Sequence, residues 1–81
     1  MDGSPFEVTF RVIQLNDRNR VGPTAATPEL AKLAAAAVDF GSDETLAMER
    51  TEWISLPDRM KAHRTIVTEA QTEPGKWPAY P

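Results

Sequence analysis

The only histidine of the chain, His63, is the first candidate for a catalytic or metal-binding group. It stands beside Arg64 and near Lys61, and no carboxylate lies at a spacing typical of a group that orients a catalytic base. Catalysis by a triad needs a nucleophile, a base and an orienting group within mutual reach. One histidine alone does not make a metal site, and the lack of cysteine excludes disulfides, thiolate zinc sites and a cysteine nucleophile. We therefore expect no enzymatic activity, no metal and no cofactor.

The acidic residues and the glycines carry no further catalytic signature. Pairs such as Asp43 and Glu44 arise readily among twelve acidic residues, so their spacing is not diagnostic. The four glycines are scattered singly and form neither a phosphate-binding loop nor a dinucleotide-binding motif. Binding is the function class that remains.

A short basic cluster, formed by Arg59, Lys61 and Arg64 with His63, defines one binding hypothesis. A β-hairpin would carry these residues near its tip, and a two-stranded ribbon of this kind can enter a groove of nucleic acid. The net charge of −3 and the position of Asp58 inside the cluster weaken the attraction to phosphate. A nucleic-acid-binding regulator, with Arg59, Lys61 and Arg64 as possible phosphate contacts, is therefore the alternative function.

The last ten residues, 72–81, have the composition of an extended tail. Their prolines prevent a helix or strand from continuing. The tail also contains Trp77 and Tyr80, and large amphipathic rings are enriched at protein interfaces. Pro78 and Pro81 give a P-x-x-P spacing, which favours an extended conformation that docks at low entropic cost. We expect Trp77, Pro78 and Tyr80 to bind a partner; alternatively, Trp77 covers the core of its own domain or lies across a second subunit.

The first regular element expected is a strand over residues 6–15, where apolar and polar residues alternate. Ile13 and Leu15 fall on the face opposite Val8 and Val12. The end of the strand is therefore either covered on both faces or shifted by a bulge. Residues 16–26 are rich in Asn, Asp, Gly and Pro, which predicts a loop.

A helix is expected over residues 27–40. Thr27 can cap its first turn, Pro28 suits the first helical position, and Gly41 can adopt the left-handed conformation that ends helices. Helical spacing gathers one apolar stripe, which we expect to lie on the sheet: Leu30, Leu33, Ala34, Ala37 and Val38. The other faces are smooth and uncharged because they carry Ala31, Ala35 and Ala36.

Residues 43–56 fit either a helix or a strand. We favour the strand because Trp53 and Ile54 lead into Pro57-Asp58-Arg59, a sequence that suits a turn. The β-branched run within residues 62–71 predicts a second strand, which completes a hairpin. Trp53 is the largest packing group of this hairpin and a further candidate for partner binding.

These elements predict an α+β fold for a single domain over residues 1–71: a small β-α-β-β domain with one helix packed on a three-stranded sheet, followed by the Pro-rich tail. A sheet of this size leaves a face and its edges poorly covered. Domains of about this length often depend on disulfides, metals or a second subunit. We therefore predict a small non-enzymatic protein-protein interaction module, a regulatory, inhibitory or accessory subunit that forms a homodimer or binds another protein.

The composition of the chain also predicts the cellular compartment of the protein and the kind of organism it comes from. No apolar stretch approaches the roughly 20 residues that cross a bilayer, and residues 1–5 lack the features of a signal peptide. We expect a cytoplasmic protein with no membrane partner. Frequent alanine and a preference for arginine over lysine indicate a bacterial or phage protein.

Overall fold

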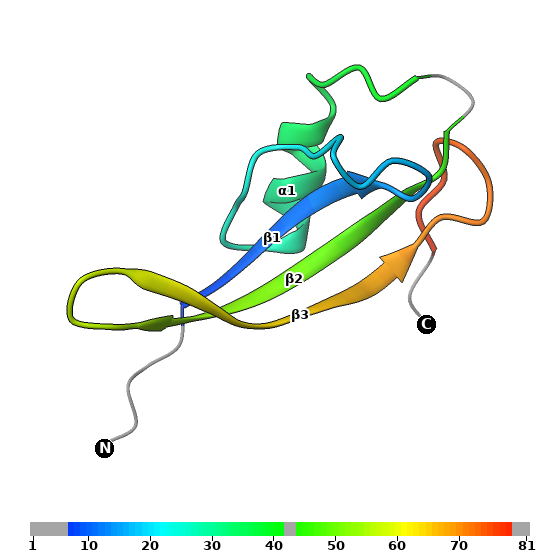
Figure 1. The fold of residues 1–81 in the computed structure, drawn as a ribbon. Helices are drawn as coiled ribbons and strands as arrows, with labels where there is room; N and C mark the ends of the chain where they lie inside the picture. Colours follow the sequence, from blue (N-terminus) through cyan, green and yellow to red (C-terminus); the bar gives the residue numbers. More distant parts are fainter. Residues whose placement is uncertain (1–6, 42–43, 79–81) are drawn as a thin grey trace.

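The computed structural model describes residues 7–41 and 44–78. Three strands form one antiparallel sheet in the order β1-β2-β3, and a helix packs on one of its faces (Figure 1). The elements follow in the predicted order: β1 (Glu7–Gln14), α1 (Pro28–Ala35), β2 (Leu46–Ser55) and β3 (Met60–Ala70). This confirms the α+β fold and the choice of a strand over a helix for the middle segment.

β1 pairs with β2 without a register shift, and Val12 lies opposite Met48. Val12 and Ile13 are both fully buried although they point to opposite faces of the sheet. The end of β1 is therefore covered on both sides, which is the first of the two alternatives considered for this strand.

The segment that follows β1 returns along the outer edge of that strand. Phe10 and Ala25 exchange two backbone hydrogen bonds of 2.8 Å. The amide of Gly22 donates to the carbonyl of Val12 at 2.7 Å, and the amide of Gln14 donates to the carbonyl of Arg20 at 3.0 Å. Residues 20–25 thus satisfy backbone groups that an edge strand otherwise leaves open.

α1 begins as predicted but ends earlier. The Thr27 hydroxyl accepts a hydrogen bond from the amide of Leu30, and Pro28 is the first helical residue. The helix stops at Ala35, whereas the expected helix extended to residue 40. The ring of Phe40 is buried in the core, and its carbonyl accepts a hydrogen bond from the Gln14 side chain. The chain must leave the helix to make these contacts.

The face of α1 that contacts the sheet is the alanine face, so the expected orientation is wrong. Ala31 is 0% exposed and Ala35 is 7% exposed, whereas Leu30 is 51% exposed and Leu33 is 71% exposed. Small side chains let the helix lie close to β1, and this close approach leaves no room for leucine on the inner face. The core combines five buried residues: Val12, Ala31, Ala35, Phe40 and Met48.

β2 and β3 form a long hairpin. Its turn is closed by a backbone hydrogen bond from Leu56 to Arg59, as the Pro57-Asp58 sequence predicted. The first residue of β1, Glu7, lies opposite Trp53. Residues 54–61, here called the hairpin arm, therefore extend beyond the N-terminal end of β1 and away from α1 (Figure 1). Two register shifts interrupt the β2 and β3 pairing, one on each side of an uninterrupted central run.

Candidate functional site

The basic residues predicted as phosphate contacts lie on the hairpin arm or next to it. Arg59 is in the turn, and Lys61 and Arg64 are on β3; all three are exposed. Arg64 lies opposite Glu52 of β2, and Lys61 lies opposite Ile54. The three basic residues therefore lie in the turn and in the first half of β3, at the turn end of the hairpin.

An acidic residue accompanies this cluster. Glu52 accepts a hydrogen bond of 2.6 Å from the guanidinium of Arg50. This hydrogen bond lowers the pKa of Glu52, the positive charges of Arg50, Arg64 and His63 lower it further, and burial acts in the opposite direction. The carboxylate is ionised near neutral pH and offsets part of the positive charge around Arg64.

The tail lies against its own domain through Trp77. This ring is half-buried and packs against the core cluster. The ammonium group of Lys32 in α1 lies 4.9 Å from the centre of the ring, within the range of a cation-π interaction. Pro78 is exposed, and Tyr80 lies outside the described residues. Of the three placements considered for Trp77, this is the one in which it covers the core of its own chain.

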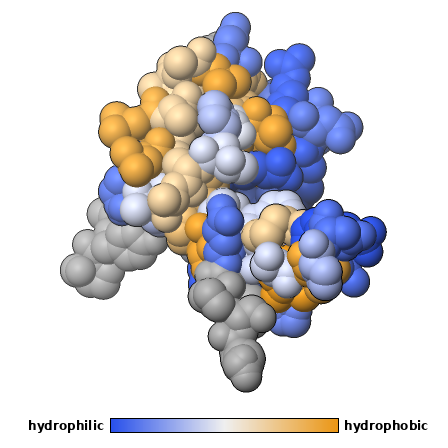
Figure 2. All heavy atoms as spheres, turned by 90° about the vertical axis from the view of Figure 1, so that its left-hand side faces the viewer, coloured by the Kyte–Doolittle hydropathy of each residue, from blue (hydrophilic) through white to orange (hydrophobic). Residues whose placement is uncertain are grey.

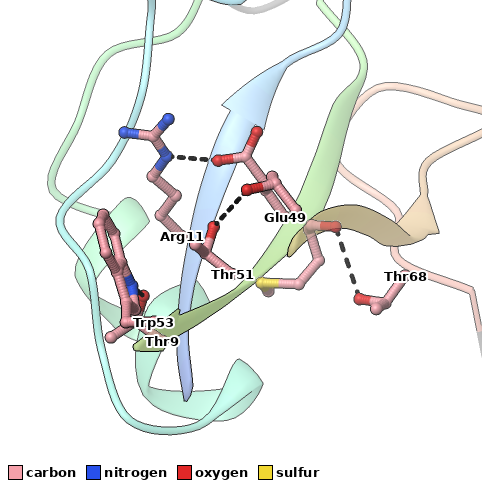
Figure 3. A network of polar contacts seen from close by, with 8 residues as sticks. Thr9, Arg11, Glu49, Thr51, Trp53 and Thr68 are labelled. Atoms are coloured by element: carbon pink, nitrogen blue, oxygen red, sulfur yellow. Dashed lines mark hydrogen bonds and ion pairs between the residues drawn. The ribbon is translucent and has the colours of Figure 1, made fainter. Parts of the chain in front are cut away.

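Trp53 contributes to a hollow on the sheet face opposite α1 (Figure 3). Its indole N-H donates a hydrogen bond of 2.8 Å to the Thr9 hydroxyl. Beside it, Nε of Arg11 contacts the Glu49 carboxylate at 2.7 Å. The hollow is lined largely by polar side chains of the three strands: Thr9, Arg11, Glu49, Thr51, Trp53 and Thr65.

The polar groups in this hollow pair with one another. Glu49 pairs with Arg11, and the hydroxyl groups of Thr51 and Thr65 lie 3.3 Å apart. Within the described part of the chain, no three His, Cys, Asp or Glu residues are placed to hold a metal ion. Sequence reasoning missed this hollow; part of its signal was the alternation of Glu7, Thr9 and Arg11 along β1, whereas β2 is polar at all four positions 49–52 and shows no such alternation.

A second feature missed from the sequence is the outer face of α1. It consists of Leu30 and Leu33, with Ala34 beside them on the same helical stripe. Figure 2 shows apolar atoms gathered in the upper part of the molecule, at the height of α1 and its flanking loops, above a largely polar hairpin end. The largest apolar side chains of the helix therefore face solvent.

Comparison of the chain with protein-family models, curated proteins and solved structures gave no match. No helix in residues 7–41 and 44–78 is long and apolar enough to span a membrane. A function must therefore be inferred from the surfaces described above.

Proposed function

We propose that this protein is a non-enzymatic interaction module, a regulatory or accessory subunit that binds another protein through the outer face of α1. The observation that carries the proposal is the orientation of α1, which turns its alanines toward the sheet and its leucines toward solvent. Leu33 is 71% exposed and Leu30 is 51% exposed, while alanines fill the inner face. A helix that needed only to cover its own sheet would place the leucines inward.

The physical reason is the free energy of apolar burial. Complete burial of a leucine side chain contributes about 1.5–3 kcal/mol. Contiguous exposed apolar patches are a feature of binding surfaces on small soluble proteins. The small side chain of Ala34 beside the leucines also allows a partner helix to approach closely. The expected partner is therefore a protein that presents an apolar helix or groove.

The test compares a variant of the outer face with a matched control. Leu30→Gln/Leu33→Gln removes the apolar face, whereas Val67→Gln changes a β3 residue that is also exposed. Partners are cross-linked to the tagged wild-type protein in its host, identified by mass spectrometry, purified and titrated against all three proteins. We expect the double variant to bind at least about tenfold more weakly, since a tenfold change corresponds to about 1.4 kcal/mol. Equal affinity for the double variant and the wild type would contradict the proposal.

The alternative, a nucleic-acid-binding regulator, is supported by the projection of the hairpin arm with Arg59 and Lys61 exposed on it. The ionised Glu52 beside Arg64 counts against it. Retention of nucleic acid would fall steeply with salt, and Arg59→Ala/Lys61→Ala would reduce the salt dependence. Salt-sensitive and nuclease-sensitive capture, unchanged by Leu30→Gln/Leu33→Gln, would favour this alternative over protein binding.

A further inference from the structure

The hollow on the sheet face opposite α1 has the size of a site for a small ligand. Its volume is about 180 Å³, below the roughly 300–1,000 Å³ of sites that hold drug-sized molecules. Thr24, from the segment that covers the edge of β1, lines one side of it. A second hollow of about 250 Å³ adjoins it toward the hairpin arm, because Thr9, Thr24 and Trp53 line both. The two hollows therefore form one groove with the Trp53 side chain in common.

The polar groups of the hollow keep unused hydrogen-bonding capacity although they pair with one another. Nε of Arg11 donates to Oε1 of Glu49, and both Nη atoms of Arg11 lie on the side of the guanidinium away from that carboxylate (Figure 3). Within the described part of the chain, no residue bonds these Nη atoms or Oε2 of Glu49. The Thr9 hydroxyl accepts a hydrogen bond from Trp53, so it can still donate its own proton. The hollow thus offers a ligand both donors and an acceptor.

The charges around the hollow favour a neutral ligand. Arg11 and Glu49 are the ionised groups that line it, and their charges cancel. Lys61 and Arg64 are the strand partners of the two neighbours of Trp53 in β2, so both point to the other face of the sheet. A phosphate or carboxylate in the hollow would lie close to the Glu49 carboxylate without a further cation to compensate it.

A sugar ring matches the chemistry of this hollow. Hydroxyl groups donate and accept, so two neighbouring hydroxyls can bridge the ion pair, one accepting from Nη of Arg11 and the other donating to Oε2 of Glu49. The C-H groups of a sugar carry a small positive charge and pack on the electron-rich face of an aromatic ring, which Trp53 supplies. Nucleotides also stack on aromatic rings, but they need a positively charged groove for their phosphates.

We propose that this groove binds a neutral carbohydrate, with one sugar ring against Trp53 and the pair of Arg11 and Glu49, and the next ring in the second hollow beside Met60. A monosaccharide of about twelve non-hydrogen atoms should have a dissociation constant on the order of 1 mM, and a disaccharide should bind about tenfold more tightly. The groove lies on the sheet face that α1 does not cover. This proposal and protein binding through α1 can therefore fail independently.

A titration followed by nuclear magnetic resonance tests the site in the full chain. The neutral probes are glucose, mannose, galactose, N-acetylglucosamine, cellobiose, maltose, mannobiose, lactose and chitobiose. We expect at least one disaccharide to shift the indole N-H resonance of Trp53 and the Nε-H resonance of Arg11 saturably. The indole resonance of Trp77, which packs on the core beside α1, should stay in place. No saturable shift of the Trp53 resonance with any of these sugars up to about 50 mM would overturn the proposal.

Two substitutions in the hollow and two matched controls separate sugar recognition from changes in the fold. Arg11→Lys keeps the charge but loses the forked donors, and Glu49→Gln replaces an accepting oxygen by a donor. Arg18→Lys and Glu29→Gln make the same exchanges at exposed residues outside the hollow. We expect each of the first two variants to bind the best disaccharide at least about tenfold more weakly, with an unchanged circular dichroism spectrum. Unchanged affinity of both variants, or equal weakening of the controls, would contradict the proposal.

Anionic probes test the chemical class of the ligand. Glucose 6-phosphate and glucuronate carry the ring of glucose with an added negative charge, and both should bind more weakly than glucose because Glu49 repels that charge. Adenosine 5′-monophosphate adds a planar base. Tighter binding of any of these three anions than of every neutral sugar would show that the groove selects an anion or a base, and would overturn the proposal.

Discussion

The ammonium group of Lys32 lies 4.9 Å from the centre of the Trp77 ring, which joins α1 to the tail. The same ammonium group lies 3.0 Å from the Glu69 carboxylate near the end of β3. One side chain of α1 thus contacts both β3 and the tail that follows β3. This arrangement explains why the tail folds back although its prolines exclude a regular element.

Trp77→Ala tests the contribution of the tail to stability. The ring is half-buried against the core, so we expect its loss to reduce the free energy of unfolding by about 1–3 kcal/mol. Trp77→Phe should lose less because it keeps an aromatic ring over Lys32. Urea unfolding followed by far-UV circular dichroism measures both changes. Equal stability of Trp77→Ala and the wild type would show that the packing of this ring is not energetically significant.

Lys32→Met tests the ion pair with Glu69. The Glu69 side chain is only 4% exposed, and the substitution leaves its carboxylate without the ammonium group that compensates its charge. We expect a loss of about 2–4 kcal/mol at neutral pH, because a buried charge without its partner is costly. Thermal and urea unfolding at neutral pH measure this loss. In the double variant Lys32→Met/Glu69→Gln, part of the stability should return; a further loss instead would contradict this explanation.

Because α1 packs through its alanines, substitutions on its two faces should change the free energy of unfolding differently. Ala31→Leu adds volume to a fully buried site, and we expect a loss of about 1–3 kcal/mol from overpacking. Leu33→Gln changes a side chain that is already exposed, and the unfolding free energy should stay within about 0.5 kcal/mol of the wild-type value. Urea midpoints of the two variants check the orientation of α1. A stabilised Ala31→Leu together with a strongly destabilised Leu33→Gln would show that the helix packs through its leucines.

The hydrogen bond between Arg50 and Glu52 predicts a pH dependence of stability. The pKa of Glu52 is lower in the folded protein than its ordinary value, so the folded state favours the ionised carboxylate. The stabilisation is complete above the ordinary glutamate pKa and is lost as the pH falls through the lowered folded value. Urea unfolding at neutral and acidic pH should show Glu52→Gln less stable than the wild type at neutral pH. The difference between the two proteins should shrink in acid; a constant difference would contradict this assignment.

Substitution by alanine should reduce the free energy of unfolding more at Gly41 than at Gly22. Gly41 has a φ of +96°, a left-handed conformation that alanine adopts at a cost of about 1 kcal/mol. At Gly22, an added Cβ would meet its nearest neighbours at 3.5–3.6 Å, which is ordinary contact distance, so Gly22→Ala is the matched control. Thermal unfolding should show the larger loss for Gly41→Ala. The reverse order would indicate that the space around Gly22 limits stability more than the backbone of Gly41.

Local patterns predicted the fold because they act over short sequence distances. Alternation identified β1, the Thr27-Pro28 pair identified the start of α1, and Pro57-Asp58 identified the hairpin turn. The end of α1 was not predictable in this way. It depends on the burial of Phe40 and on the hydrogen bond from Gln14, which are contacts across the fold.

The candidate surfaces were harder to predict. The sequence pattern placed Leu30 and Leu33 inward because hydrophobicity alone ranks leucine above alanine. The distance between helix and sheet decides the orientation instead, and that distance is set by the packing of Ala31 and Ala35 on β1. The closed edge of β1 was also hidden, because it rests on backbone hydrogen bonds that leave no side-chain pattern.

The closure of the β1 edge by residues 20–25 has a consequence for assembly. A sheet with two open edges can add subunits indefinitely and grow into a filament. Here β1 already has backbone partners along its outer side, so β3 is the edge on which the described part of the sheet can accept another strand. Strand addition to the described part of the sheet is therefore confined to one edge of each molecule. Residues 20–25, which complete the β1 side of the sheet, thus also prevent growth of the sheet by strand pairing at both edges.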